Sequence, residues 1–254
     1  MNPFHAAFAL LSYLVFLGSF LYAIGFVGDF LVPTTIDAPA GAGGWMAWVV
    51  DAAVLAAFAL QHSIMARPGF KRWWTRLVPV AIERSIYVLL SSLLLVLVFV
   101  AWRPLPGVVW DLRGTPAEGA MWVLFALGWL VVLLSTFMIS HFELFGLTQA
   151  WRRARDRVPE EGGFTERFFY RFVRHPIMLG FLVAFWATPM MSRGHLLFAL
   201  LTSAYIVVGV KLEERDLVRK LGQAYVGYRE RVPMFFPRPG RRQAPPAKPA
   251  VPQA

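Results

Sequence analysis

Residues 83–102 read ERSIYVLLSSLLLVLVFVAW, and this stretch decides the class of the fold. After the opening Glu83-Arg84 pair, the run carries no charged side chain up to Trp102. As an α-helix, it would extend about 30 Å at 1.5 Å per residue, which matches the roughly 30 Å hydrocarbon core of a bilayer. The stretch therefore predicts a membrane-spanning helix that begins at a charged pair.

The same pattern recurs along the chain, which is 57% hydrophobic and only 16% charged. The long apolar runs cover about residues 6–30, 45–65, 83–102 and 120–140, and two shorter ones cover about 177–191 and 195–212. A tight turn at Met191-Ser192-Arg193-Gly194 is expected between the last two. The sequence thus predicts an all-α integral membrane protein with about five to six transmembrane helices, the last two forming a short hairpin.

Domain organisation follows from where the apolar pattern stops. Residues 1–236 are expected to form a single domain, because no internal repeat is visible. Residues 237–254 are rich in proline and basic residues and cannot bury a core, so a disordered tail is expected there.

Basic residues predict how the chain is oriented in the membrane. Lys and Arg concentrate in segment 66–80, in segment 141–174 and after Lys211, whereas the alternate loops hold only Arg103, Arg113 and Arg193. The positive-inside bias then places both termini in the cytoplasm, with six passes through an inner membrane. The net charge of +10 is therefore assigned to orientation in a bilayer, and nucleic acid is not expected as a partner.

The chain contains no cysteine. This excludes disulfides, thiolate zinc sites, iron–sulfur clusters and a cysteine nucleophile.

Ionisable residues at the cytoplasmic ends of the predicted spans are the functional candidates, because charge at membrane depth is costly. They are His62, Glu83, Arg84, His141, Glu143, Arg174, His175, Glu213 and Glu214. The opposite side offers one histidine in a span-linking segment, His195, which is assigned to a surface turn. Chemistry is therefore expected on the cytoplasmic side.

Each candidate also has a plainer interpretation. Glu83 and Arg84 could form a local ion pair, and His62 could cap or snorkel at the end of its span. His141 and Glu143 are two residues apart, so on one helix they would diverge by about 200°. A haem held by His62 and His141 stays open, although no spacing favours it, and no metal site is predicted.

Residues 173–237 carry the most specific pattern. They contain VRHPIMLG, then the hairpin, then KLEERDLVRKLGQAYVGYRERVPMFFP. His175 precedes a proline and is expected to be extended, whereas Pro176 suits the first turn of a helix. Gly180 lets a helix or ligand approach closely. Glu213 and Glu214 are expected to end the last span, with Tyr225 and Tyr228 on one face of a following helix.

This combination resembles the isoprenylcysteine carboxyl methyltransferase family of membrane enzymes. The resemblance implies that a module of about residues 165–236 binds S-adenosylmethionine at the cytoplasmic face. Arg174, His175, Pro176 and Gly180 would then line the cofactor site, and Glu213 or Glu214 would hold its amino or hydroxyl groups. Tyr225 and Tyr228 would cover the adenosine. Met178 stands where the family commonly has a tyrosine.

The N-terminal segments FALQHSIMARPGFKRWW and LLSTFMISHFELFGLTQ look like those of the methanethiol S-methyltransferases, the bacterial branch that makes dimethyl sulfide. The resemblance implies methyl transfer to a small thiol. Two alternatives stay open: the same fold acting on an isoprenylcysteine carboxylate or a phospholipid amine, and an NADPH-dependent membrane reductase or haem-binding protein.

Methyl transfer to a thiol requires a base, since the thiolate is the nucleophile. A group with a pKa near neutrality suits this role. The candidates are, in order, His141, Glu143 and His62, with Glu83 and Arg84 orienting them.

Overall fold

The protein is a bundle of long helices. The computed structural model describes residues 3–39, 44–153 and 168–237. Within that part, five helices are long and apolar enough to cross a membrane, and one further apolar helix is short. The long ones are α1 (Pro3–Gly28), α2 (Gly44–Ala66), α4 (Val80–Ala101), α5 (Pro116–Ile139) and α9 (Arg193–Leu221), and the short one is α8 (Pro176–Trp186). The chain is thus a multi-pass, all-α membrane protein, as predicted.

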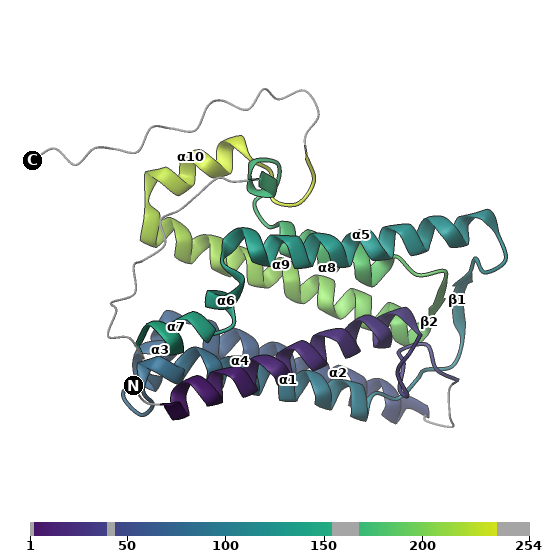
Figure 1. Ribbon diagram of the computed structural model, residues 1–254. Helices are drawn as coiled ribbons and strands as arrows, with labels where there is room; N and C mark the ends of the chain where they lie inside the picture. The colour runs from purple at the N-terminus through teal and green to yellow at the C-terminus, as the bar shows by residue number, and fades with distance from the viewer. Residues whose placement is uncertain (1–2, 40–43, 154–167, 238–254) are drawn as a thin grey trace, which may run out of the picture.

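The remaining elements are short and gather at the two ends of the bundle (Figure 1). They are α3 (Pro68–Trp74), β1 (Val108–Asp111), α6 (His141–Leu144), α7 (Leu147–Arg153), η1 (Phe168–Arg171), β2 (Met190–Ser192) and α10 (Gln223–Arg231). Both strands lie at one end, here called the sheet end. α3, α6, α7 and α10 lie at the opposite end, where α1 also begins, and which is called the α10 end.

The predicted C-terminal hairpin is correct in its short first helix and wrong in its turn. α8 has 11 residues, about 16 Å at the helical rise, which is too short to cross the hydrocarbon core. Met190–Ser192 forms β2 instead of a turn, and it pairs antiparallel with β1. Ser192 then caps α9, because its hydroxyl oxygen accepts a hydrogen bond from the His195 backbone N–H.

α9 is also longer than the sequence indicated. It continues to Leu221, so Glu213 and Glu214 lie inside the helix and not at its end. The break comes at Gly222, whose φ of +59° suits a glycine at the end of a helix. α10 therefore follows as a separate helix that folds back.

α5 and α8 pack unusually closely because glycines meet where they cross. A Cβ added to Gly180 would lie 2.7 Å from the carbonyl oxygen of Gly128, and one added to Gly128 would lie 2.7 Å from the backbone nitrogen of Ala184. Neither position tolerates a side chain without a shift of the backbone. Since Gly180 also faces Val132, one turn further along α5, the two helices run antiparallel.

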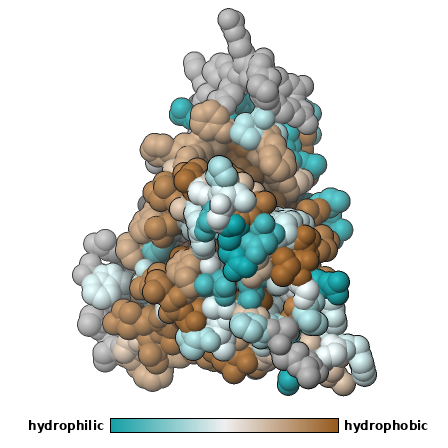
Figure 2. Space-filling model, turned by 90° about the vertical axis from the view of Figure 1, so that its right-hand side faces the viewer, coloured by the Kyte–Doolittle hydropathy of each residue, from teal (hydrophilic) through white to brown (hydrophobic). Residues whose placement is uncertain are grey.

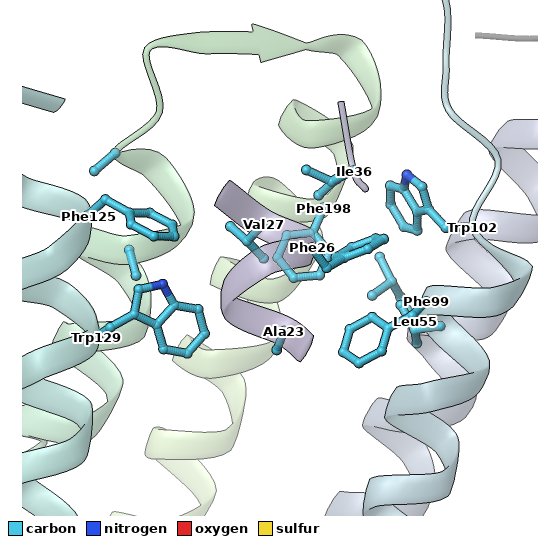
Figure 3. Close-up of a cluster of buried hydrophobic side chains, with 13 residues drawn as sticks. Ala23, Phe26, Val27, Ile36, Leu55, Phe99, Trp102, Phe125, Trp129 and Phe198 are labelled. Carbon is cyan, nitrogen blue, oxygen red and sulfur yellow. The ribbon is translucent and has the colours of Figure 1, made fainter. Parts of the chain in front are cut away.

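The largest hydrophobic cluster lies toward the sheet end (Figure 3). Phe26 and Val27 of α1 point into it together with Phe99, Trp129 and Phe198 from three other long helices. Phe26 packs against Phe99 and Trp102 with ring centroids 5.0 and 5.8 Å apart. This cluster joins the helices into one core at the end where the sheet lies.

His195, expected on the surface, is fully buried in α9 at the sheet end. Its Nδ1 lies 2.7 Å from Asp37 Oδ2, and its Nε2 lies 2.9 Å from the carbonyl oxygen of Phe185. The other Asp37 oxygen accepts from the Ser192 backbone N–H at 3.0 Å. The surface assignment was wrong because the partner, Asp37, comes from a loop far away in the sequence.

Figure 2 looks onto the sheet end and shows hydrophilic side chains near the middle of this face, with hydrophobic ones on either side. The exposed charged residues of this end include Arg103, Asp111, Arg113 and Arg193. Arg113 and Asp111 form an exposed ion pair. Of the predicted C-terminal tail, residues 238–254 lie outside the described residues, as do residues 165–167 of the predicted cofactor module.

Candidate functional site

Two groups of polar side chains lie toward the α10 end of the bundle. The first, called the Glu214 cluster, consists of Arg174, His175, Glu213, Glu214 and Arg229. The second, called the His141 cluster, consists of Tyr13, Thr136 and His141. The packing of α5 against α8 shows that the two clusters lie at a similar level along the bundle. Gly180 faces Gly128 and Val132, so the start of α8 lies level with the end of α5. His175 and His141 adjoin those two helix ends.

Glu214 is the centre of the first cluster and is buried. Its Oε1 accepts from Arg174 Nε at 2.6 Å and lies 3.1 Å from His175 Nε2. Its Oε2 lies 3.4 Å from Arg229 Nε. A buried carboxylate requires such partners, because an unpaired charge would be costly away from water.

The chain after α10 fixes the residues that face Glu214. The backbone N–H groups of Arg174 and His175 donate to the carbonyl oxygens of Pro233 and Met234 at 2.9 and 3.2 Å. The Arg174 guanidinium also donates to the carbonyl oxygen of Val232. Arg174 and His175 therefore form the contact between the start of α8 and the C-terminal segment, which the sequence pattern had grouped only by resemblance.

The other predicted cofactor residues have different surroundings. Glu213 is half exposed, with its Oε2 3.9 Å from His175 Nδ1. Pro176 is buried at the first position of α8, and Met178 is half-buried two residues before Gly180. Gly180 faces α5, so what the structure shows of it is helix packing. Of its two predicted uses, close approach of a helix is the one observed.

Tyr225 and Tyr228 are buried and lie side by side, with ring centroids 5.8 Å apart. Their rings pack with Leu217, Val218 and Leu221 and so hold α10 against α9. The Tyr228 hydroxyl donates to the carbonyl oxygen of Tyr170 at 2.7 Å, and burial raises the pKa of Tyr225 to about 12. A contact between these rings and a cofactor stays a prediction.

His141 lies on α6, a single turn that starts after α5 ends at Ile139. Its Nε2 lies 2.9 Å from the Tyr13 hydroxyl of α1, and its Nδ1 lies 2.8 Å from the Thr136 hydroxyl of α5. The Phe137 ring stacks on the imidazole with centroids 4.3 Å apart. Burial lowers the pKa of His141, which favours a neutral imidazole able to accept a proton.

Glu143 lies on the same turn as His141 but is only half-buried. Its backbone carbonyl accepts a hydrogen bond from the Gln149 side chain at 3.0 Å, which ties α6 to α7. His141 and Glu143 therefore lie on the same helical turn, but His141 is buried and Glu143 is only half-buried.

His62 lies in α2 and faces α4. Its Nε2 lies 2.9 Å from the Tyr87 hydroxyl, its Nδ1 lies 3.3 Å from the Ser91 hydroxyl, and its ring stacks on Phe58. These contacts fix the imidazole within the bundle, so it neither caps nor snorkels.

Glu83 and Arg84 do not pair with each other. Glu83 is buried and lies 3.4 Å from Lys71 Nζ of α3. Arg84 donates to the carbonyl oxygen of Leu144 at 2.8 Å and lies over the Tyr87 ring. Arg84 thus links Tyr87, the hydrogen-bond partner of His62, to α6, the turn that carries His141.

Tyr13 and Thr136 were missed by the sequence reasoning, because both lie inside long apolar runs. Arg229 was also missed, and only the folding back of α10 brings it to Glu214. Within the described residues, no group of three His, Asp or Glu side chains is placed to hold a metal ion.

Comparison with known proteins gives consistent matches. Residues 52–212 match the model of the family described as NnrU protein. The chain is 56% identical to a Mycobacterium tuberculosis protein named methanethiol S-methyltransferase, over 91% of this chain and 94% of that protein. It is 50% identical to methanethiol S-methyltransferase 2 of Bradyrhizobium diazoefficiens, over 91% of this chain and 89% of that protein. No solved structure gives a significant match.

Proposed function

The chain belongs to the NnrU family and, within it, to the methanethiol S-methyltransferases, and on this premise we propose that it is an enzyme that methylates methanethiol to dimethyl sulfide. The observation that carries the proposal is the extent of the match, because relatives of that name align with nine-tenths of this chain and of their own length. The family model also includes His62, His141 and His175 within its limits.

The proposed methyl donor is S-adenosylmethionine, bound by the Glu214 cluster. When bound, it supplies an electrophilic methyl group on a positively charged sulfur. The donor set suits its polar groups: Arg174 and Arg229 are guanidiniums that suit a carboxylate, and the half-exposed Glu213 suits an ammonium or ribose hydroxyls. Glu214 pairs with Arg174 and His175 and so would fix their positions in the site. Pro176 and Met178 would line the same side at the start of α8.

His141 is the proposed base that removes the thiol proton. Its support is a buried position, a lowered pKa and a hydrogen-bond partner at each ring nitrogen. A neutral imidazole accepts a proton, and burial among aromatic rings excludes competing water. Arg84 would orient the site by holding the Leu144 carbonyl of the same turn, with Glu83 behind it. Glu143 and His62 are the next candidates for the base.

The proposal extends to placement in the cell. The basic segments at the α10 end support an inner-membrane protein whose termini and both clusters face the cytoplasm, where S-adenosylmethionine is available. Residues 1–236 would act as one domain, since residues from α1 to α10 take part in the two clusters.

The test is headspace detection of dimethyl sulfide from cells that express the chain and receive methanethiol. We expect product with the parent chain and at least about a hundredfold less with His141→Ala, the usual contribution of a general base. Purified protein should gain melting temperature with S-adenosylmethionine and not with NADPH. Absence of product from folded, inserted protein would refute the proposal and favour another methyl acceptor.

A further inference from the structure

The hydrogen bonds around His141 fix where its proton lies. The Thr136 hydroxyl donates to the backbone carbonyl of Leu133 at 2.7 Å, so its one proton is already used. Toward His141 Nδ1, 2.8 Å away, the Thr136 oxygen can then only accept. In this arrangement Nδ1 carries the imidazole proton, and Nε2 carries the free electron pair that makes the ring a base.

The group that faces this electron pair is the phenol of Tyr13, which lies on α1. The Tyr13 hydroxyl lies 2.9 Å from Nε2, and because Nε2 has no proton, Tyr13 is the donor. The three hydrogen bonds therefore all point the same way. Tyr13 donates to His141, His141 donates to Thr136, and Thr136 donates to the Leu133 carbonyl. A thiol that approaches the basic nitrogen of His141 meets the Tyr13 oxygen first.

The surroundings of Tyr13 suit a small apolar thiol. Its ring lies edge-on to the imidazole, and the rings of Phe16, Phe142 and Phe145 have centroids 6.1, 6.4 and 6.2 Å from it. The three phenylalanine side chains cannot form a hydrogen bond with the thiol, so among these rings the Tyr13 hydroxyl is the polar group available to it. Tyr13 itself is only half-buried.

Building on the proposed function, we infer that Tyr13 is a further catalytic residue, which relays the proton of the thiol to Nε2 of His141. The S–H bond breaks as the proton passes to the Tyr13 oxygen, and the Tyr13 O–H bond breaks as its own proton passes to Nε2. The thiolate then forms a C–S bond to the methyl group of a sulfonium donor. The donor's C–S bond breaks, its electron pair stays on the donor sulfur, and the imidazolium later releases the proton to water.

The chain offers a matched pair of variants to test this. Tyr13→Phe removes the hydroxyl that bonds His141, and Tyr22→Phe removes one from the same helix that bonds Thr34. With purified protein saturated with S-adenosylmethionine, Tyr13→Phe should lower the single-turnover rate of methanethiol methylation about a hundredfold, as loss of a general acid–base group does. Tyr22→Phe should stay within twofold. An unchanged rate in Tyr13→Phe would overturn the relay.

A second readout needs no activity. The ¹⁵N NMR spectrum of histidine-labelled protein, with the His141 signals assigned by their loss in His141→Gln, should show a protonated Nδ1 and an unprotonated, hydrogen-bonded Nε2. Tyr13→Phe should shift the Nε2 resonance alone. Thr136→Val should mix the two tautomers, and Thr136→Ser, which keeps the hydroxyl, should restore the parent spectrum. A protonated Nε2 in the parent protein would contradict the inference.

These outcomes separate the inference from the proposed function. If the parent chain makes dimethyl sulfide and Tyr13→Phe is as fast, the relay fails and the function stands. If the parent chain makes none while the NMR spectra are as predicted, the function fails and the hydrogen-bond chain stands. If Tyr13→Phe loses S-adenosylmethionine binding along with the rate, Tyr13 is structural and the relay is wrong.

Discussion

Each end of the bundle buries a carboxylate against a histidine, and the two pairs differ in what surrounds them. At the sheet end, Asp37 bonds His195 and the Ser192 backbone, and the other His195 nitrogen faces a carbonyl oxygen. At the α10 end, Glu214 faces His175 and two arginines, and one of those arginines, Arg229, is partly exposed. The first pair joins elements of the fold to one another, whereas the second opens onto the molecular surface.

The difference indicates a division of tasks. The sheet end combines the largest hydrophobic cluster with the Asp37–His195 pair, and so it supplies stability. The α10 end combines short helices, half-exposed charges and a histidine whose pKa is lowered by burial, and we propose that it supplies the chemistry. Substitutions at the sheet end should therefore change unfolding, and substitutions at the α10 end should change binding and turnover.

The largest effect is expected for Asp37→Ala. It leaves the buried His195 ring and the Ser192 N–H without their acceptor, which should lower the free energy of unfolding by about 3–5 kcal/mol. Denaturant titration in detergent micelles measures this. The transfer rate per folded molecule should hold, and a loss below about 1 kcal/mol would break the assignment of stability to the sheet end.

The next effect is expected for Glu214→Gln, which removes the charge that Arg174, His175 and Arg229 face. Hydrogen bonds to charged groups contribute about 1.5–3 kcal/mol, so the affinity for S-adenosylmethionine should fall at least about tenfold. Calorimetric titration measures the affinity. Glu118→Gln is the control, because it makes the same chemical change at the sheet end, where Glu118 accepts from the Gly114 N–H. Equal affinities in the two variants would remove the donor site from the Glu214 cluster.

A smaller effect is expected for Gly180→Ala, since Gly180 was predicted to line the cofactor site and is observed against α5. The added methyl group meets backbone at 2.7 Å and should cost about 1–3 kcal/mol of stability. Donor affinity of the folded fraction should change little. If affinity falls while the unfolding transition is unmoved, the residue belongs to the donor site after all.

The smallest effect is expected at the exposed pair of Asp111 and Arg113. Hydrogen bonds from Arg113 lower the pKa of Asp111 from 3.8 to about 2. Because the folded pKa lies below the unfolded one, the pair stabilises the protein above pH 4 and loses that contribution as pH falls toward 2. Melting temperatures of the parent and Asp111→Asn should differ slightly above pH 4 and converge near pH 2. A gap that widens on acidification would contradict the sign.

The spans, by contrast, could be predicted from the sequence. An uncharged run such as 85–102 must satisfy its backbone hydrogen bonds internally in lipid, and a helix does so within one segment, so length and composition predict it. The short strand Met190–Ser192 could not be predicted, since three residues between two apolar runs carry no periodicity. Its partner strand comes from a loop about 80 residues earlier.

The candidate site was predictable only in part, for a related reason. Arg174, His175 and Glu214 stand out because charge is rare near apolar runs, and the structure brings them together. Tyr13 and Thr136 have polar tips that a membrane helix accommodates anywhere, so only the fold reveals that both face His141. His195 was misplaced because a histidine near a turn is normally exposed, and its carboxylate partner lies 158 residues away.

One measurement tests the division between the two ends most directly: the initial rate of dimethyl sulfide formation per folded molecule in Asp37→Asn and Glu214→Gln. Both variants replace a buried carboxylate that pairs with a histidine by an amide of the same shape. We expect Asp37→Asn to keep the parent rate within about threefold and Glu214→Gln to lose at least about tenfold at subsaturating S-adenosylmethionine. Equal losses in both variants, or the greater loss in Asp37→Asn, would contradict that division.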